Sequence, residues 1–100
     1  MAGLLGLTLC GQSIAQTTGN DYRHWCETHD PICTSYVVGF THGLALGDRT
    51  IFCPPSAVTN GQIIEVVKAY MRSHPEEHHL EMSTLIYIAV QKAFPCRKSR

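Results

Sequence analysis

The chain has 100 residues, a length that suits a single small domain. Its eight Lys and Arg residues balance its eight Asp and Glu residues, and only 16% of the chain is charged. This composition excludes the strong net field that draws proteins to nucleic acid or to an anionic membrane. The basic residues at 97–100 are the one local bias, and we interpret them as a solvated chain end.

The first residues differ from the rest because they carry no charged side chain and are rich in Leu, Gly and Ala. Ser13 and Ala15 are small residues at the spacing that a signal peptidase requires, so we predict a signal peptide at 1–15 and a mature domain at 16–100. The missing basic start suggests a true start codon further upstream, and the segment is too short to cross a bilayer. A packed or disordered N-terminal arm and an acylated end at Cys10 are the alternatives.

Two helices are expected in the first half of the mature chain. The segment beginning at Asn20 is polar, contains two aromatic residues and is typical of a short helix capped by Asn20. Asp30 can cap a second helix that ends near Gly47, since Pro follows it at the first helical position. Gly39 and Gly43 lie four residues apart in this helix and indicate close packing against another helix. Its apolar stripe recurs at three and four positions: Cys33, Tyr36, Val37, Phe40 and Leu44.

The second half of the chain predicts a helical hairpin. Two prolines keep residues 50–55 extended, and a capping box formed by Thr59 and Gln62 then begins a helix that stops at His74. A last helix ends before Pro95. Together these elements predict an all-α fold, a small bundle of about four helices around one core. The apolar positions of the last helix are Met82, Leu85, Ile86, Ala89 and Ala93.

Cysteine usage supports export. Loss of the signal peptide removes Cys10 and leaves four cysteines, an even number that predicts two disulfides outside the cytosol. A reduced cytosolic chain with buried thiols is the alternative. Of the three pairings that four cysteines allow, we favour the one that joins neighbouring helices locally. Its bridges are Cys26–Cys33 and Cys53–Cys96, and so small a core needs such staples.

Catalytic and metal motifs are missing from the sequence. It contains no nucleophile elbow, phosphate loop or dinucleotide motif, and disulfides would leave no thiolate, so we predict neither an enzyme nor a cofactor. His74, His78 and His79, beside two glutamates, are the one candidate metal cluster. The turn at Pro75 breaks the helical spacing that ligands need, so we interpret this segment as a polar helix connection without metal. We interpret His42 as a partly buried structural residue, and a histidine pH switch remains an alternative.

An ordered series of motifs runs from Cys33 to Cys96. It comprises Gly39-Phe40-x-x-Gly43, Phe52-Cys53-x-Pro55-x-x-Val58-Thr59-x-Gly61-Gln62, Tyr70, His74-Pro75-Glu76-Glu77-x-His79-Leu80 and Ala93-Phe94-Pro95-Cys96. The series resembles the Rap/Tai family of immunity proteins against amidase effectors of type VI secretion. This resemblance implies an all-α, disulfide-containing periplasmic fold, a homodimer, and a peptidoglycan amidase toxin as the protein partner whose cleft is blocked.

The resemblance does not identify the inhibitory surface. An inhibitor that occludes a cleft needs a protruding element with few internal ties, and the loops at 47–58 and 74–81 qualify. We favour the first, because it combines charge with apolar area. Its predicted partner-binding residues are Asp48, Arg49, Ile51 and Phe52. For Ile51 and Phe52, a place in the core beside Cys53 is the alternative.

A different function is also compatible with these features. A periplasmic acid-stress chaperone, or an envelope structural protein of similar helical fold, would have no toxin partner. Six histidines fit acid-driven opening, whereas the low content of charged residues fits such a chaperone poorly. An immunity protein need not open in acid, whereas an acid-stress chaperone would. Circular dichroism and dimer dissociation, compared at acid and neutral pH, therefore separate the two functions.

Overall fold

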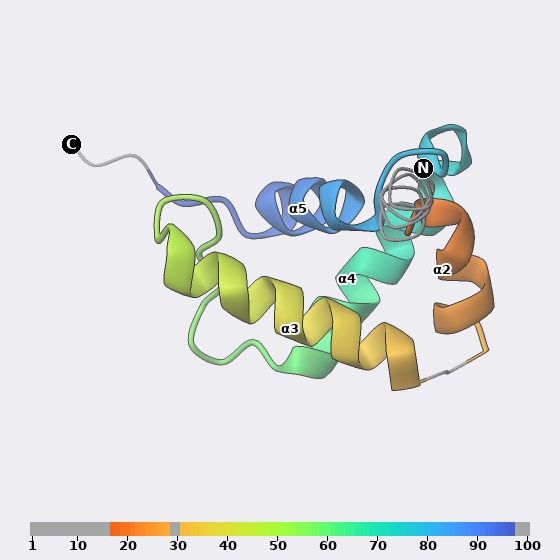
Figure 1. Cartoon of the computed structure of the whole chain (residues 1–100). Helices are drawn as coiled ribbons and strands as arrows, with labels where there is room; N and C mark the ends of the chain where they lie inside the picture. Colours follow the sequence, from red (N-terminus) through yellow and green to blue (C-terminus); the bar gives the residue numbers. More distant parts are fainter. Residues whose placement is uncertain (1–16, 29–30, 98–100) are drawn as a thin grey trace, which may run out of the picture.

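The computed structural model describes residues 17–28 and 31–97, so the predicted signal peptide, the Asp30 cap and most of the basic tail lie outside the described residues. In these ranges the chain forms four α-helices and one 3-10 turn, without a strand (Figure 1). The predicted all-α bundle with two disulfides is confirmed. None of the described helices is long and apolar enough to cross a membrane. The elements are α2 (Gly19–Cys26), α3 (Pro31–Gly47), α4 (Asn60–Ser73), η1 (Pro75–Glu77) and α5 (Met82–Ala93).

Helix α2 begins two residues earlier than predicted. Its cap is Thr18 instead of Asn20: the backbone N–H of Thr18 donates to Oδ2 of Asp21 at 3.0 Å, and Oγ1 of Thr18 accepts from the Asn20 N–H at 3.2 Å. This reciprocal capping box satisfies backbone donors that Asn20 would leave unpaired. The same segment pairs with the chain that enters α5, because the Gly19 N–H donates to the Leu80 carbonyl at 2.9 Å.

The backbone of Gly19 lies very close to the segment between η1 and α5 and to α5 itself. A Cβ atom at this position would lie 2.5 Å from Cδ1 of Leu85 and 2.9 Å from Cα of His78. Because the second neighbour is backbone, it cannot rotate away as a flexible side chain can. Only glycine therefore lets α2 approach η1 and α5 this closely.

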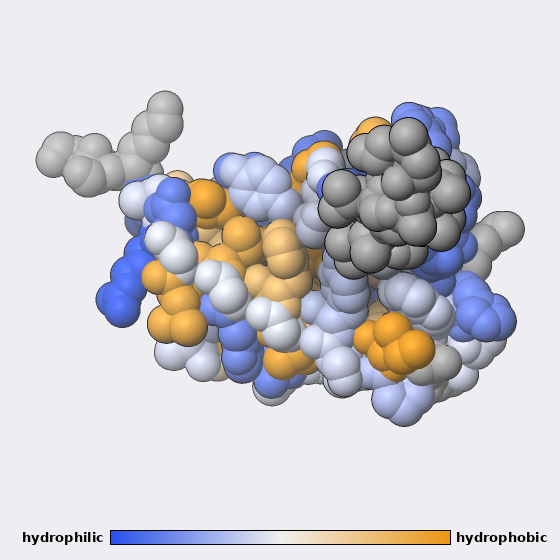
Figure 2. Space-filling model, viewed as in Figure 1, coloured by the Kyte–Doolittle hydropathy of each residue, from blue (hydrophilic) through white to orange (hydrophobic). Residues whose placement is uncertain are grey.

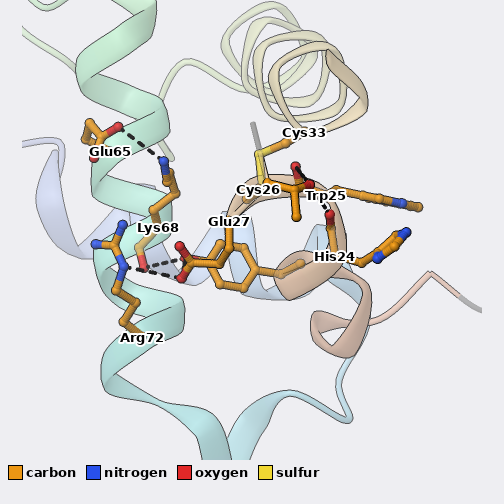
Figure 3. Close-up of a disulfide and its surroundings, with 10 residues drawn as sticks. His24, Trp25, Cys26, Glu27, Cys33, Glu65, Lys68 and Arg72 are labelled. Atoms are coloured by element: carbon orange, nitrogen blue, oxygen red, sulfur yellow. Dashed lines mark hydrogen bonds and ion pairs between the residues drawn. A yellow bond between two sulfur atoms is a disulfide. The ribbon is translucent and has the colours of Figure 1, made fainter. Parts of the chain in front are cut away.

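Tyr22 connects α2 to α4. Its side chain is buried, and its hydroxyl lies 3.0 Å from Oε2 of Glu27 and 3.2 Å from the carbonyl oxygen of Lys68. Burial, reinforced by the Glu27 carboxylate, raises the pKa of Tyr22 to about 12. Glu27 also accepts from Nε of Arg72 on α4 at 3.4 Å, as Figure 3 shows. These contacts hold the polar helix α2 against α4.

Helix α3 buries one stripe and exposes the other side. Cys33, Val37 and Thr41 face the core, and the Thr41 hydroxyl donates to the Val37 carbonyl at 2.9 Å, so its burial leaves no unpaired donor. The predicted close packing of Gly39 and Gly43 is wrong. Both are exposed, and a Cβ built on either meets nothing within 4 Å. At 100° per residue, these two positions lie on a different side of the helix from the core stripe.

Helices α4 and α5 form the predicted hairpin. The Thr59–Gln62 capping box is present, with the Thr59 N–H donating to Oε1 of Gln62 at 2.8 Å and the Gln62 N–H to Oγ1 of Thr59 at 3.1 Å. Helix α4 ends at Ser73 with His74 as its cap, as predicted. Ala93 is exposed, contrary to the predicted stripe. The buried residues of α5 are Met82, Leu85, Ile86, Ala89 and Val90.

Both disulfides have the local pairing that we favoured. Cys26 is bonded to Cys33 with a Cα–Cα distance of 5.0 Å, and Cys53 to Cys96 with 4.9 Å. The first joins the end of α2 to the start of α3 (Figure 3). Their surroundings differ: Cys26 and Cys33 are 2% and 3% exposed, whereas Cys53 lies on the surface.

Substitution of Gly19 tests the close approach of α2 to η1. We expect Gly19→Ala to lower the free energy of unfolding by about 1–3 kcal/mol, the usual cost of overpacking. Gly61→Ala is the matched control, since its Cβ would lie 3.7 Å from Oγ1 of Thr59, an ordinary contact. Thermal unfolding followed by circular dichroism measures both. Equal melting temperatures for Gly19→Ala and the wild type would contradict the packing described.

Candidate partner-binding surface

The α3–α4 loop, residues 48–59, starts with a turn that Asp48 organises. Oδ1 of Asp48 accepts from the Thr50 hydroxyl at 2.6 Å and from the Thr50 backbone N–H at 2.9 Å. These two bonds, the hydroxyl first, hold the pKa of Asp48 below its usual range. Because of this turn, Ile51 is not extended as predicted. The Asp48 carboxylate therefore shapes the loop.

Arg49 is the exposed cation of this loop. Its side chain makes no hydrogen bond or ion pair with the residues that the structure describes. Its backbone is well supported, since its carbonyl oxygen lies 3.4 Å from Sγ of Cys53 and 3.6 Å from Sγ of Cys96. The charged group is exposed and therefore available to a partner, which would order the side chain at a cost of about 0.5–1.5 kcal/mol while the backbone is already in place.

Phe52 and Ile51 differ in burial, although they are neighbours in the chain. Phe52 is only 5% exposed and packs edge-on against Phe94, with ring centroids 6.1 Å apart, so the core alternative describes it. Ile51 is half-buried and lines a shallow hollow of about 270 Å³ between α3 and α5. Leu44 and Tyr87 lie on the same hollow. Of the four predicted residues, Asp48, Arg49 and Ile51 thus reach the surface.

A second hollow, which the sequence did not indicate, lies along the exposed side of α3. This α3 hollow has a volume of about 420 Å³. It shares Phe40 and Leu44 with the first hollow. Figure 2 shows apolar residues gathered over this part of the molecule, between α3 and α5. The residues that line the α3 hollow are Gly39, Phe40, Gly43, Leu44, Gly47 and Asp48.

The other candidate loop, at 74–81, is tied to α4. Nδ1 of His74 lies 2.9 Å from the Tyr70 carbonyl oxygen, and the two rings stack with centroids 4.0 Å apart. The Tyr70 hydroxyl donates to Oε1 of Glu77 at 2.7 Å, and buried His78 bonds through Nε2 to the Met71 carbonyl at 2.8 Å. These ties make this loop the weaker candidate for a protruding element.

The histidines that the structure describes do not assemble into a cluster. In residues 17–28 and 31–97, no group of three or more His, Cys, Asp or Glu side chains is placed to hold a metal ion. His42 is exposed instead of partly buried, because it lies on the solvent side of α3, where Nε2 is 3.3 Å from Oδ1 of Asn60. His42 thus joins α3 to α4, and His78 ties the 74–81 loop to α4.

A small helical domain with an exposed, internally braced loop is typical of a protein that binds another protein. A family model agrees with this class: the model of Rap1a immunity proteins matches residues 11–96, most of the chain. The chain therefore belongs to the Rap1a immunity family, and it is an immunity protein whose family binds toxin effectors. No curated protein and no solved structure gives a significant match.

The Asp48 turn can be tested apart from binding. We expect Asp48→Ala to speed hydrogen exchange at the Thr50 amide, because the acceptor is lost, while Arg49→Ala leaves exchange unchanged. In the wild type, the pKa of Asp48 is lowered, so the contribution of its carboxylate to the turn is present above pH ~4 and is lost as pH falls through the folded-state pKa. NMR amide exchange measures this, and unaltered exchange in Asp48→Ala would contradict the role of the carboxylate.

The exposure of the disulfides predicts an order of reduction. A thiolate must reach a sulfur atom to attack it, so a mild dithiol should open Cys53–Cys96 well before Cys26–Cys33. Alkylation of the released thiols at intervals, followed by peptide mass analysis, measures the two rates. The reverse order would show that the buried bridge is more accessible than its surroundings indicate.

Proposed function

We propose that the protein is a periplasmic immunity protein that binds a type VI secretion peptidoglycan amidase and occludes its cleft with the α3–α4 loop. Membership of the Rap1a family supports the immunity role, and the resemblance to the Rap/Tai proteins supports an amidase as the toxin. The observation that carries the choice of surface is Arg49, an exposed cation without an intramolecular partner among the described residues.

The base of the loop suits insertion into a cleft. The Cys53 N–H donates to the Phe94 carbonyl at 3.0 Å, Phe52 packs on Phe94, and the disulfide to Cys96 adds a covalent tie. A loop anchored in this way loses little conformational entropy when it is bound, so more of the contact energy contributes to affinity. The tip at Arg49 stays accessible while its base is rigid.

The chemistry of inhibition needs no catalytic group in this chain. Arg49 would supply donors for carboxylate or carbonyl oxygens lining the toxin cleft, and Ile51 would add apolar contact beside it. A stoichiometric complex of this kind prevents the peptide of peptidoglycan from entering. Inhibition then depends on affinity and on the amount of immunity protein present.

The periplasm is the compartment that this proposal requires. Two disulfides favour an oxidising compartment, and the predicted signal peptide at 1–15 provides a route of export. Peptidoglycan lies in the same compartment, so toxin and inhibitor would meet there. We also propose that the protein acts as a homodimer, as the family resemblance implies.

Arg49 is the residue to substitute first. We expect Arg49→Ala to raise the Kd for the cognate amidase about tenfold or more, since a lost hydrogen bond to a charged group costs about 1.5–3 kcal/mol. Its melting temperature should not change, because the side chain is exposed. Isothermal titration calorimetry measures the Kd. Lys92→Ala is the control, an exposed cation of α5 outside the α3–α4 loop, and its melting temperature is measured too because Nζ lies 5.6 Å from the Tyr70 ring centroid.

Two different outcomes would contradict the choice of binding surface and the proposed function. Equal affinity for Arg49→Ala and the wild type would remove this loop as the binding element and leave the immunity role open. A wild-type protein that inhibits peptide release from isolated sacculi by none of the type VI secretion amidases tested would contradict the proposed function itself.

A further inference from the structure

The Cys53–Cys96 disulfide lies against the backbone of Arg49, the residue that we assign to toxin binding. The Arg49 carbonyl oxygen is 3.4 Å from Sγ of Cys53 and 3.6 Å from Sγ of Cys96. Among the residues that the structure describes, these sulfur atoms are the only polar partners of Arg49. The bridge is therefore the direct support of the Arg49 backbone.

The residues beside Arg49 are held in a different way. The Asp48 N–H donates to the Leu44 carbonyl at 3.0 Å, and the Thr50 N–H donates to Oδ1 of Asp48 at 2.9 Å. Both hydrogen bonds are local and involve no sulfur, so they do not depend on the bridge. A change at the disulfide thus acts directly on Arg49, while the Asp48 turn keeps its own hydrogen bonds.

The bridge is accessible to a thiol. Cys53 is exposed and Cys96 is half-buried, whereas both cysteines of the other disulfide are almost fully buried. Arg97 follows Cys96 directly and is exposed, so it adds a positive charge near the bridge. Positive charge favours the thiolate form in which a cysteine leaves a disulfide. Access and charge therefore both favour thiol–disulfide exchange at this place.

The base of the loop has supports that do not need the sulfur–sulfur bond. The Cys53 N–H donates to the Phe94 carbonyl at 3.0 Å, and the rings of Phe52 and Phe94 pack with centroids 6.1 Å apart. The buried Cys26–Cys33 bridge is also independent of it. Opening of Cys53–Cys96 lowers stability, because the bridge joins residues 43 positions apart, but these contacts keep the chain folded.

We propose that Cys53–Cys96 is a redox switch that controls how Arg49 is presented to the toxin. The reductant is a dithiol. Its thiolate attacks the exposed sulfur of Cys53, Cys96 leaves as a thiolate and takes up a proton, and the second thiol of the reductant then releases Cys53. The dithiol gives up two electrons and two protons and becomes a disulfide, and the chain gains two thiols.

Reduction changes the surroundings of Arg49. The two sulfurs separate to non-bonded distance, and each becomes an S–H group that can donate to the Arg49 carbonyl. Two rotatable thiols then replace a fixed bridge, so toxin binding has to order the loop tip. The proposal rests on the proposed function, because it adds control to the surface assigned there. It couples full inhibition to an oxidising compartment.

Calorimetry with a type VI secretion amidase that the wild type inhibits tests this control. Mild dithiol treatment that opens only Cys53–Cys96 should raise the Kd about three- to tenfold, the cost of ordering one or two more groups on binding. The double variant Cys53→Ser, Cys96→Ser is the matched control, because it lacks the bridge without any reductant. It should bind with the Kd of the reduced wild type. Equal affinity of this variant and the oxidised wild type would overturn the switch.

A measurement without toxin separates the switch from the proposed function. The Thr50 amide nitrogen belongs to the same peptide group as the Arg49 carbonyl, so its NMR signal reports the contacts of that carbonyl. We expect reduction to move the Thr50 signal and reoxidation to restore it, while the amide signals of buried Leu85 and Ile86 stay in place. An unchanged Thr50 signal, or loss of signal dispersion along the whole chain, would overturn the switch.

Failure of the proposed function has a different result. A wild type that binds none of the type VI secretion amidases tested, in either redox state, would contradict the proposed function even if the Thr50 signal moves. A wild type that binds an amidase equally well in both states would contradict the switch alone.

Discussion

Burial of the apolar face of α5 is the constraint on which the rest of the structure depends. Helices α2, α3 and α4 all pack against α5, and five of its side chains are buried. Each of the four larger ones contributes about 1.5–3 kcal/mol, which is a large share of the stability available to so small a domain. These four are Met82, Leu85, Ile86 and Val90. Helix α5 also fixes the positions of the loops, because its two ends contact the segments that lead into α2 and out of α3.

The position of the α3–α4 loop illustrates this dependence. Phe94, the residue that caps α5, accepts the Cys53 N–H and packs against Phe52. The base of the loop is therefore part of the core, whereas Asp48 builds the tip through a local turn and leaves Arg49 exposed. Long-range packing makes the base of the loop rigid, and local hydrogen bonding shapes its accessible tip. This division explains why a substitution of Arg49 should change binding without changing stability.

Local signals predicted the fold well, and tertiary signals were harder to interpret. The Thr59–Gln62 capping box, the stop at His74 and the local disulfide pairing depend on neighbours in the sequence. The true cap at Thr18 also had its own local signal, Asp21 three residues on, which the sequence analysis did not use. The sequence could not predict whether Gly39 and Gly43 face the core or the solvent, because glycine spacing is the same on a packed and on an exposed face of a helix. The difference in burial between Phe52 and Ile51 depends on Phe94, which lies far along the chain and packs against Phe52.

The two disulfides also determine how the chain would respond to a pulling force. Cys53–Cys96 encloses α4, η1 and α5 in one covalent ring, and Cys26–Cys33 closes a small ring between α2 and α3. Force applied between the ends of the domain would bypass both rings and act on α2, on α3 and on the first part of the α3–α4 loop. Under mechanical load, α2 and α3 would therefore extend, and the hairpin of α4 and α5 would not be drawn out to its full contour length while Cys53–Cys96 is intact.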